Sequence, residues 1–416
     1  MDLSSFRALR TPSGQDVLAA ATGADVGGDG LIATAARLRE RHDPELVAAA
    51  LTQARLRERA KAKFGADAER MYFTEAGLEQ STRASVAAYR AGRFADRLAG
   101  ARVLELGCGI GADLVARARA GLIGDGVDLD PLTAEVAQAN VDALDVRDRA
   151  SVRVGDAVEQ TPDGPARYAA VFADPGRRTA RGRVFDPRAY EPPLDTVLDL
   201  AGRTGAACVK VAPGIPHEAV PDGAEAEWIS VGGDVKEAAL WLGGLAGDVR
   251  RRATLLSADG AVAGSLVPGG RGDPDVRAWG RYLYEPDGAV IRAHLVAEVA
   301  ELVGGGLADP RVAYVTSDEA RATPFAAGYE IEDVLPFSVK RLRAELRRRD
   351  VGVLTVKKRG SAVDVDKLRR DLGFGGGRKA RRGAAALTVV VTRVGRDPVA
   401  LLARPLALPP AAPEGP

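Results

Sequence analysis

The chain contains the sequence VLELGCGIG at residues 103–111, a short apolar run that leads directly into a glycine-rich turn. The apolar run predicts a buried strand, and the helical spacing after the turn predicts a strand–turn–helix unit. Glycines in such a turn allow the backbone to approach a ligand closely, and the N-terminus of the helix has unpaired N–H groups. The stretch therefore predicts a ligand site at the carboxyl end of a strand.

Around this turn, short apolar runs alternate with helical stretches. The candidate strands are residues 102–106, 124–128, 151–154, 169–172, 206–211 and 227–231. This alternation is typical of βα units, so we expect an α/β fold with a doubly wound, Rossmann-like parallel sheet.

We expect five segments along the chain. They are a helical domain at 1–99, the ligand-binding α/β domain at 100–250, an α/β extension at 251–335, a small basic α/β domain at 336–405 and a disordered Pro/Ala-rich tail at 406–416.

Capping residues place several helices within these segments. Asp43 and Pro44 predict a helix that ends at Gly65, and a second helix is expected over residues 77–98. Residues 71–80 between them are interpreted as a packed loop, with a substrate lid as the alternative. A helical stretch is expected at 289–303. Within the basic domain we expect helices after Ser338 and Asp364 and strands at 352–356 and 386–394.

The composition excludes several classes of protein. Of the 416 residues, 46% are apolar and 28% are charged, which is typical of a soluble globular protein. Two cysteines and three histidines are too few for a disulfide framework or a zinc site, so we expect no metal. Since there is no long apolar stretch and the first residues lack the apolar core of a signal peptide, we expect a cytoplasmic protein that does not enter membranes.

Carboxylates follow the expected strands one after another. Asp128 and Asp130 follow the second strand, Asp156 and Ala157 follow the third, and Asp174 follows the fourth. Asp128 is placed to accept hydrogen bonds from ribose hydroxyls, and Asp156 is placed to accept one from an exocyclic adenine amine. Each acid alone is more typical of a solvated loop residue or a helix cap, but their succession after a glycine turn predicts a nucleoside-containing ligand.

The glycine turn also satisfies the looser dinucleotide-binding pattern, through Gly107, Gly109 and Ala112. Glu105 argues against NAD, because a dinucleotide site needs an apolar residue inside that strand. A carboxylate two residues before the first glycine suits a ligand that carries an ammonium group.

These motifs resemble those of the class I S-adenosylmethionine-dependent methyltransferases, over roughly residues 100–245. The resemblance implies S-adenosyl-L-methionine as cofactor, with its methionine part near the glycine turn, its ribose at Asp128 and its adenine at Asp156. The transfer site would be at Asp174. The candidate cofactor-binding residues are Glu105, Gly107, Cys108, Gly109, Gly111, Asp128, Asp130, Asp156, Ala157 and Asp174.

The whole chain resembles a narrower family, bacterial methyltransferases with a helical N-terminus and a C-terminal THUMP-like domain. The motifs that carry the resemblance are DPGRR at 174–178, GGDVKEA at 232–238, YLYEP at 282–286 and LPFS at 335–338. Because THUMP domains are associated with RNA binding, the resemblance implies an RNA substrate, either tRNA or rRNA. The oligomeric state is left open.

The residues after Asp174 differ from those of base-amine methyltransferases, which place a proline and an aromatic residue where this chain has Gly176 and Arg177. Arg177 could stack on a base or hold a phosphate, and Arg178 could hold a phosphate. Pairing of both arginines with local acids such as Asp186 is the alternative. We take Asp174, Arg177 and Lys210 as the candidate catalytic residues.

A second constellation points to ribose 2′-O-methylation. Asp174, Lys210 and Glu237 resemble three members of the Lys-Asp-Lys-Glu tetrad of ribose methyltransferases, in which a desolvated lysine takes the hydroxyl proton. The fourth member is missing from its usual place, and the nearest upstream lysines are Lys61 and Lys63. A structural pairing of Glu237 with its neighbour Lys236 is the alternative.

Positive charge is concentrated near the C-terminus. Residues 337–397 contain 18 Lys/Arg and 6 Asp/Glu, whereas residues 1–336 contain 39 and 50. Such a segment suits contacts with RNA phosphates, although a solvated face is the alternative. The candidate RNA-binding residues are Arg178, Lys357, Lys358, Arg359, Arg378, Lys379, Arg381 and Arg382. We therefore expect an RNA methyltransferase; the alternatives are a small-molecule methyltransferase and a non-catalytic RNA-binding protein.

Overall fold

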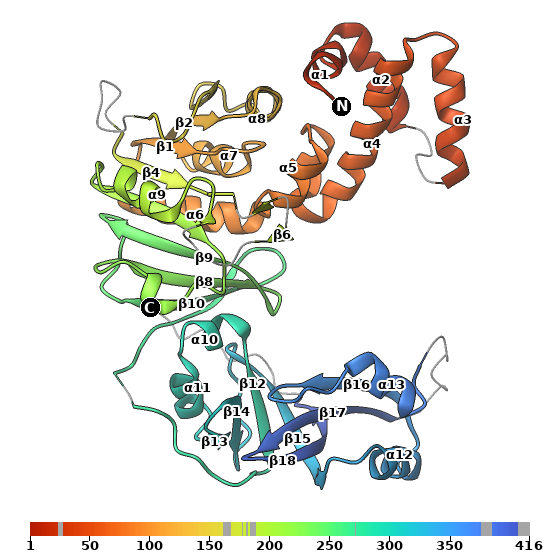
Figure 1. The fold of residues 1–416 in the computed structure, drawn as a ribbon, viewed down its shortest axis with the longest axis vertical. Coiled ribbons are helices and arrows are strands. Elements are labelled where there is room, and N and C mark those ends of the chain that lie inside the picture. Colours follow the sequence, from red (N-terminus) through yellow and green to blue (C-terminus); the bar gives the residue numbers. More distant parts are fainter. Residues whose placement is uncertain are drawn as a thin grey trace. The chain divides into compact units, whose positions relative to one another are not determined.

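The computed structural model describes residues 1–23, 28–160, 168–176, 178–179, 182–183, 189–270, 272–375 and 385–406. The chain forms two compact units (Figure 1). The first contains Met1–Glu227, Glu237–Arg250 and Ala258–Ala261, and the second contains Trp228–Lys236, Arg251–Ser257 and the chain from Val262 onward.

The first unit begins with helices, which are α1 (Leu3–Leu9), α2 (Pro12–Thr22), α3 (Gly28–Arg39), α4 (Pro44–Phe64), η1 (Gly65–Glu69), α5 (Glu75–Gln80) and α6 (Ala84–Arg97). The predicted caps of α4 are confirmed, because Asp43 accepts hydrogen bonds from two backbone N–H groups and Gly65 has a φ of 57°. The single helix predicted over residues 77–98 is wrong. Its chain leaves the helical conformation at Ser81, so α5 and α6 are separate.

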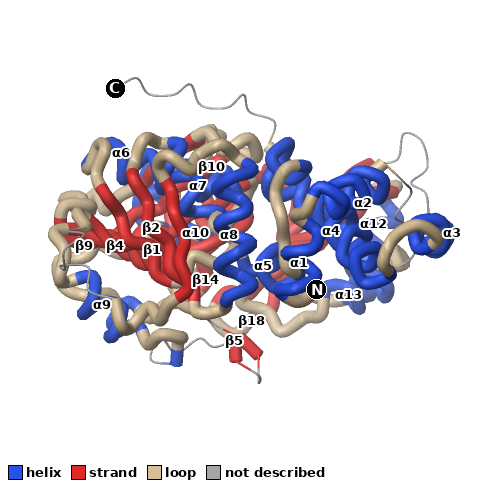
Figure 2. The backbone as a smooth tube through the Cα atoms, turned by 90° about the horizontal axis from the view of Figure 1, so that it is seen from above, coloured by secondary structure: helices blue, strands red, loops and turns tan. Residues whose placement is uncertain are grey.

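The predicted parallel sheet is confirmed in the first unit. Its parallel strands are β1 (Arg102–Leu106), β2 (Ile123–Asp128), β3 (Ala150–Val154), β4 (Ala170–Ala173) and β7 (Ala206–Val211), in the order β3-β2-β1-β4-β7. The crossover helices are α7 (Ala112–Arg119), α8 (Pro131–Ala143) and α9 (Leu194–Ala201). Figure 2 shows α9 on the opposite face of the sheet from α6 and α7. Because these five strands are parallel, their carboxyl ends all lie at one edge of the sheet.

The same sheet contains a strand, β9 (Asp234–Gly243), that the sequence analysis did not predict. β8 (Glu225–Val231) and β9 form a hairpin, and β9 pairs antiparallel with β7. Glu237 lies on β9 and thereby enters the core of the first unit. The remaining short elements of this unit are β5 (Arg178–Thr179), β6 (Gly182–Arg183) and η3 (His217–Ala219).

The second unit contains β10 (Arg251–Leu256), β11 (Val262–Leu266) and a second sheet. The strands of this sheet are β12 (Tyr282–Pro286), β13 (Gly306–Asp309), β14 (Val312–Ser317), β15 (Ala326–Pro336), β16 (Val351–Lys358), β17 (Ala385–Val394) and β18 (Asp397–Pro405), in the order β13-β14-β12-β15-β18-β17-β16. Its helices are α10 (Gly288–Arg292), α11 (Val296–Leu302), α12 (Val339–Arg348) and α13 (Val365–Asp371). The boundary expected between residues 335 and 336 falls inside β15.

One helix prediction in the second unit needs correction, and two are confirmed. The helix predicted over residues 289–303 is two short helices, because His294 between them has a φ of 56°. The helices predicted after Ser338 and Asp364 are confirmed, and both caps accept backbone N–H groups. Leu342 and Leu346 on α12 pack with Leu368 on α13 over strands β16–β18. The last strand, β18, was not predicted.

Candidate active site

A cavity of about 280 Å³ lies at the carboxyl edge of the parallel sheet, beside the glycine turn. Six predicted site residues line it, which are Glu105, Gly107, Cys108, Gly109, Asp128 and Asp174. The other predicted cofactor-binding and catalytic residues that the structure describes, namely Gly111, Asp130, Asp156, Ala157 and Lys210, lie outside its lining. All of the residues that line the cavity belong to the first unit.

The glycine turn has the conformation that its sequence requires. Gly107, Gly109 and Gly111 have φ values of 69°, 55° and 80°, a region that side-chain-bearing residues rarely adopt. The backbone N–H groups of Gly107 and Cys108 both donate to the carbonyl of Val127 on β2. Gly111 ends the turn and begins α7, where an added Cβ would lie 3.4 Å from the Cβ of Ala137. The turn is thus fixed by β2 and α8.

The three aspartates after β2 and β3 have different surroundings. Asp128 accepts hydrogen bonds from the N–H groups of Gly109 (2.9 Å) and Asp130 (3.1 Å), and burial raises its pKa. The carboxylate of Asp130 accepts from the N–H of Thr133 and caps α8. Asp156 accepts from the N–H of Val158 in a local turn. Of the three, only Asp128 faces the cavity.

Glu105 lies on β1 at the base of the cavity and is 2% exposed. Burial raises its pKa to about 8, although the guanidinium of Arg117, which donates to Glu105, acts in the opposite direction. Arg117 is itself buried and stacks on the ring of Phe172. The carboxyl group is therefore held by α7 and β4.

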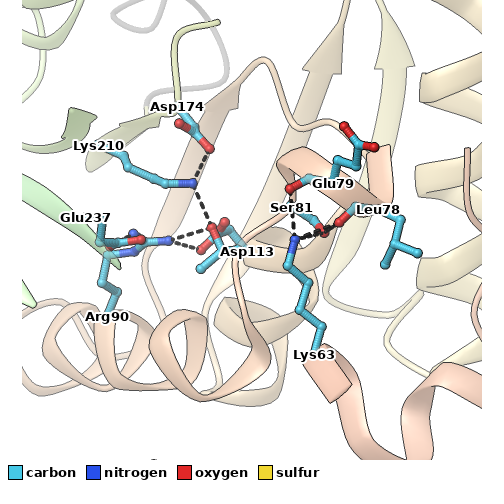
Figure 3. A network of polar contacts seen from close by, with 10 residues as sticks. Lys63, Leu78, Glu79, Ser81, Arg90, Asp113, Asp174, Lys210 and Glu237 are labelled. Atoms are coloured by element: carbon cyan, nitrogen blue, oxygen red, sulfur yellow. Dashed lines mark hydrogen bonds and ion pairs between the residues drawn. The ribbon is translucent and has the colours of Figure 1, made fainter. Parts of the chain in front are cut away.

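A network of buried polar groups surrounds Asp174 (Figure 3). The ammonium of Lys210 donates to the carboxylate of Asp174 (2.5 Å) and to the hydroxyl of Thr82 (3.0 Å). Lys210 is 4% exposed, whereas the side chain of Asp174 is 25% exposed. The pair therefore presents a carboxylate to the cavity and keeps its counter-ion in the core.

Arg90 on α6 completes this network. Its guanidinium, 1% exposed, forms ion pairs with both Asp113 and Glu237 and donates to Thr82. Burial alone would raise the pKa of Asp113, but Arg90, Lys210 and Arg117 outweigh this effect and lower it to about 2. The alternative pairing of Lys236 with Glu237 is wrong, because Lys236 contacts Asp234.

Sequence reasoning missed Thr82, Arg90 and Asp113. Arg90 has no distinguishing signal in the sequence, since it is one of several arginines on a helix and only the packing of α6 makes it central. Asp113 lies in the first turn of α7, a position at which an acidic residue is ordinary.

Lys63 on α4 lies next to the network (Figure 3). Its ammonium donates to the carbonyls of Leu78 (2.6 Å) and Glu79 (3.1 Å) at the end of α5. Burial, together with the charges of Lys210 and Arg83, lowers its pKa to about 8. Lys61, the other upstream lysine, is exposed and pairs with Glu58.

The segment at residues 71–80 covers one wall of the cavity. Thr74, Ala76, Gly77 and Gln80, on and before α5, contribute to the lining. A Cβ built at Gly77 would lie 2.3 Å from Cγ2 of Ile110, so α5 packs directly on the glycine turn. Residues 75–80 of this segment are therefore a helix that forms part of the site, so the prediction of a packed loop is wrong for them and holds for residues 71–74.

Several predicted residues lie outside the described part of the chain. These are Arg177, Asp186, Arg378, Lys379, Arg381, Arg382 and residues 407–416 of the predicted tail. The backbone of Arg178 pairs with that of Arg183 in the short β5–β6 hairpin.

The described basic residues of the second unit fall into two groups. Lys357 and Arg359 both contact Glu285, and Lys358 donates to the carbonyl of Val363 (2.7 Å). By contrast, the exposed side chains of Lys340, Arg341 and Arg347 on α12 have no hydrogen-bond or ion-pair partner among the described residues. The second group is therefore available for contacts with anions.

Two further features concern the residues that the structure describes. In this part of the chain, no helix combines the length and the apolar character needed to cross a membrane. Within the same residues, no three His, Cys, Asp or Glu side chains are grouped as metal ligands.

The chemistry of the cavity fits S-adenosylmethionine. Each carboxylate oxygen of Asp128 accepts one backbone N–H and so retains a lone pair for a ribose hydroxyl. A Cβ built at Gly109 would meet no atom within 4 Å, so this part of the turn leaves space for a ligand. Glu105 would face the ammonium group of the methionine part. When bound, the cofactor supplies a methyl group on a sulfonium, which is an activated leaving group.

Comparison with known proteins agrees with this site. Residues 326–405 match the family model described as THUMP domain-like, and residues 2–60 match a domain of unknown function. The chain is 37% identical over 351 residues to an uncharacterized S-adenosylmethionine-dependent methyltransferase of Mycobacterium tuberculosis, in strain CDC 1551 and likewise in strain H37Rv, and the match covers 82% of this chain and 91% of the relative.

A crystal structure shares the fold over almost the whole chain. It is that of a protein of Porphyromonas gingivalis W83 provisionally assigned as a methyltransferase, with a TM-score of 0.72 and 21% sequence identity. The match covers 97% of this chain and 98% of that one. From the identity and coverage of the mycobacterial relative, the chain belongs to the family of S-adenosylmethionine-dependent methyltransferases.

Proposed function

We propose that the chain transfers a methyl group to RNA and that Asp174 orients the acceptor. The observation that carries this proposal is the position of Asp174, whose carboxylate lines the cofactor cavity at the carboxyl edge of the sheet. An acceptor amine or hydroxyl that donates a hydrogen bond to this carboxylate is held with its lone pair directed away from Asp174. Orientation of this kind supplies much of the rate enhancement in a transfer between two bound groups.

Lys210 acts in this proposal as a positioning residue. It does not line the cavity, and its ammonium contacts the Asp174 carboxylate from the protein core. Thr82 fixes the ammonium from a second direction, and Arg90 in turn contacts Thr82. The network therefore restricts the rotamer of Asp174, which an isolated aspartate at a loop would not retain.

The second unit supports RNA as the acceptor. It contains the THUMP domain-like segment and the basic helix α12, on which Lys340, Arg341 and Arg347 are exposed. An exposed cationic helix face suits phosphate groups, which release their counterions on binding. A small molecule would not need such a surface, so the small-molecule alternative explains fewer of the observations.

Ribose 2′-hydroxyl methylation is the second candidate reaction. It is favoured by Lys63, whose pKa is lowered to about 8 and whose charge is coupled to that of Lys210. With Asp174 and Glu237, these lysines are the residue types of the ribose methyltransferase tetrad. Both residues have other partners in this structure, because Glu237 pairs with Arg90 and Lys63 donates to two backbone carbonyls. We therefore propose that the methyl acceptor is either a nitrogen of a base or the 2′-oxygen of a ribose, without a choice between the two.

The test is transfer of radiolabelled methyl groups to total RNA isolated from cells that lack the gene. We expect incorporation with the wild-type enzyme, followed by identification of the modified nucleoside by mass spectrometry, with RNA from wild-type cells as the control, since its sites are already methylated. Incorporation into a small-molecule extract but not into RNA would replace this proposal with the small-molecule alternative.

We further propose that the enzyme works in the cytoplasm, where its two free cysteines, Cys108 and Cys208, stay reduced.

A further inference from the structure

A second cavity, with a volume of about 590 Å³, lies within the second unit. Its walls come from the turn after β8, the end of β10, the loop after β12, the start of β15 and the end of β16. None of the residues that line it belongs to the first unit, so it is distinct from the cofactor cavity. Its volume is typical of sites for small organic molecules.

Two of the sequence motifs that the cofactor site does not use meet at this cavity. GGDVKEA (232–238) contributes Gly232 and Gly233, and YLYEP (282–286) contributes Glu285 and Pro286. The two glycines have φ values of 58° and 88°, and a Cβ built at either would meet no atom within 4 Å. The backbone turn therefore requires glycine, and the absence of side chains leaves that wall open.

Charged side chains line one part of the cavity, and the rest is mainly apolar. Lys357 donates to the carboxylate of Glu285, and Nη2 of Arg359 lies 3.7 Å from the same carboxylate. Asp287, whose carboxylate accepts the N–H of Ala289 at the start of α10, also lines the cavity, so its charged side chains are two cations and two anions. The apolar walls are formed by Leu255, Leu256, Pro286 and Pro324 together with small residues. Because Lys357 and Arg359 are partly exposed, the cavity suits a molecule whose anionic group competes with Glu285 for them and whose body is apolar or planar.

Two polar groups of this cavity have no partner among the described residues. Ser230 is 1% exposed, and its Oγ is buried without a hydrogen bond. The Nε of Arg359 is likewise buried and unpaired. Neither atom has surface that a ligand in the cavity could reach, so the contacts of a ligand fall to the exposed ends of Lys357 and Arg359.

We propose that this cavity binds a nucleoside monophosphate unit, either as a free nucleotide or as part of RNA. The phosphate contacts Lys357 and Arg359, because a guanidinium and an ammonium together match its oxygens. The base and ribose lie against the apolar walls. If the ligand is a free nucleotide, this proposal is independent of the function proposed above. If the ligand is RNA, it rests on that function.

The first experiment is calorimetric titration of the full chain with each of the four nucleoside 5′-monophosphates. The protein is first saturated with S-adenosylhomocysteine, so that no nucleotide occupies the cofactor cavity. We expect at least one monophosphate to bind, and the corresponding nucleoside to bind about tenfold more weakly or worse, because it lacks the charge-assisted hydrogen bonds. A short RNA with and without a 5′-phosphate gives the second arm.

Substitutions with opposite expected signs separate a binding site from a structural cluster. Arg359→Gln should weaken nucleotide binding, whereas Glu285→Gln should strengthen it on the order of tenfold, because it removes the anion that competes with the phosphate. Lys358→Gln is the matched control, since Lys358 carries the same charge and directly precedes Arg359 in the sequence but does not line the cavity. A structural role for the cluster would make both Arg359→Gln and Glu285→Gln weaken binding.

If Glu285→Gln does not fold, Ala327→Trp at an exposed position of the cavity wall should block binding, and Ala48→Trp at an exposed position of α4 should not.

Binding of free monophosphates, of phosphorylated RNA or of both supports the site and identifies its ligand source. Absence of binding in both arms, or equal effects of Arg359→Gln and Lys358→Gln, overturns it. If the chain binds nucleotides at this cavity but methylates no RNA, the proposed function is wrong and the nucleotide site is retained.

Discussion

Asp174 is the residue at which the cofactor cavity and the buried network meet. Its carboxylate is partly exposed to the cavity and accepts a hydrogen bond from Lys210 on the protein side. We expect Asp174→Asn to reduce methyl transfer by about 100-fold or more, because the charge that orients the acceptor is lost. The affinity for S-adenosylhomocysteine, measured by calorimetry, should change little.

Asp234→Asn is the control for this substitution, since Asp234 is exposed and contacts only the neighbouring Lys236 in the described contacts. It should leave both turnover and cofactor affinity unchanged. Wild-type turnover in Asp174→Asn would mean that the aspartate serves only to neutralise Lys210.

Glu105 makes cofactor binding dependent on pH. Its pKa is raised to about 8, so the carboxyl is largely protonated in the free protein at pH 6 and must ionise to hold an ammonium group. We therefore expect the affinity for S-adenosylhomocysteine to increase by up to about tenfold per pH unit between pH 6 and 8. Glu105→Gln should abolish this dependence.

The same raised pKa affects folding with the opposite sign. In the unfolded chain Glu105 ionises near the ordinary glutamate pKa of 4.5, so the group's contribution to folding stability falls as pH rises from 4.5 to 8.

5′-Methylthioadenosine, which has no ammonium group, is the control for the pH dependence of cofactor binding. A pH dependence as steep for this compound as for S-adenosylhomocysteine would assign the effect to another group.

At the scale of elements, α5 is the part of the helical region that shapes the cofactor cavity. A Cβ at Gly77 would lie 2.3 Å from the side chain of Ile110 and 2.8 Å from the capping hydroxyl of Thr74. Gly77→Ala should therefore displace α5 from the glycine turn, destabilise the protein by about 1–3 kcal/mol and weaken cofactor binding. Urea unfolding and calorimetry measure the two effects.

Gly92→Ala on α6 is the matched control, and it should change the folding stability in the opposite direction. A Cβ there meets no atom within 4 Å and the φ is not positive, so Gly92→Ala should stabilise the protein by about 0.5–1 kcal/mol. Equal effects of the two substitutions would show that α5 does not pack on the glycine turn as the structure has it.

The elements that could be predicted from the sequence are those with a local signal. The buried strands of the parallel sheet are short apolar runs, and the helix ends at Asp43, Ser338 and Asp364 have capping side chains. β9 was missed because three of its first four residues, Asp234, Lys236 and Glu237, are charged, which resembles a loop. Its pairing depends on β7, which is distant along the chain.

The same distinction applies to the site. Asp128 and Asp174 follow strands of a parallel sheet, so their convergence at one edge follows from topology alone. Arg90 enters the site through the packing of α6 against α7 and β9, and Thr82 through the short link before α6, which no local pattern records. The side-chain partners of Asp174 could therefore not be derived from the sequence.

At the scale of the whole molecule, the uneven distribution of charge predicts how RNA binding responds to salt. Residues 337–397 contain 18 Lys/Arg and 6 Asp/Glu. RNA affinity should fall steeply as salt increases, whereas affinity for the cofactor, whose binding displaces few counterions, should change little. Reversing the charges of Lys340, Arg341 and Arg347 should lower the slope of log Kd against log salt by about two to three.

Charge reversal at Arg37, Arg39 and Arg41 provides the control, because these exposed arginines lie at the end of α3, outside the basic segment. Filter binding over a salt series measures both slopes. A slope that falls equally in the two triple variants would show that RNA contacts the chain without preference for α12.

The path of the chain between the two units has a consequence for biosynthesis. The chain passes from one unit to the other after residues 227, 236, 250, 257 and 261. A nascent chain that has left the ribosome only as far as residue 230 holds Arg90 without Glu237, one of its two carboxylate partners. The catalytic unit is therefore finished only after synthesis of the other has begun, and no single stop codon or gene fusion point separates the two.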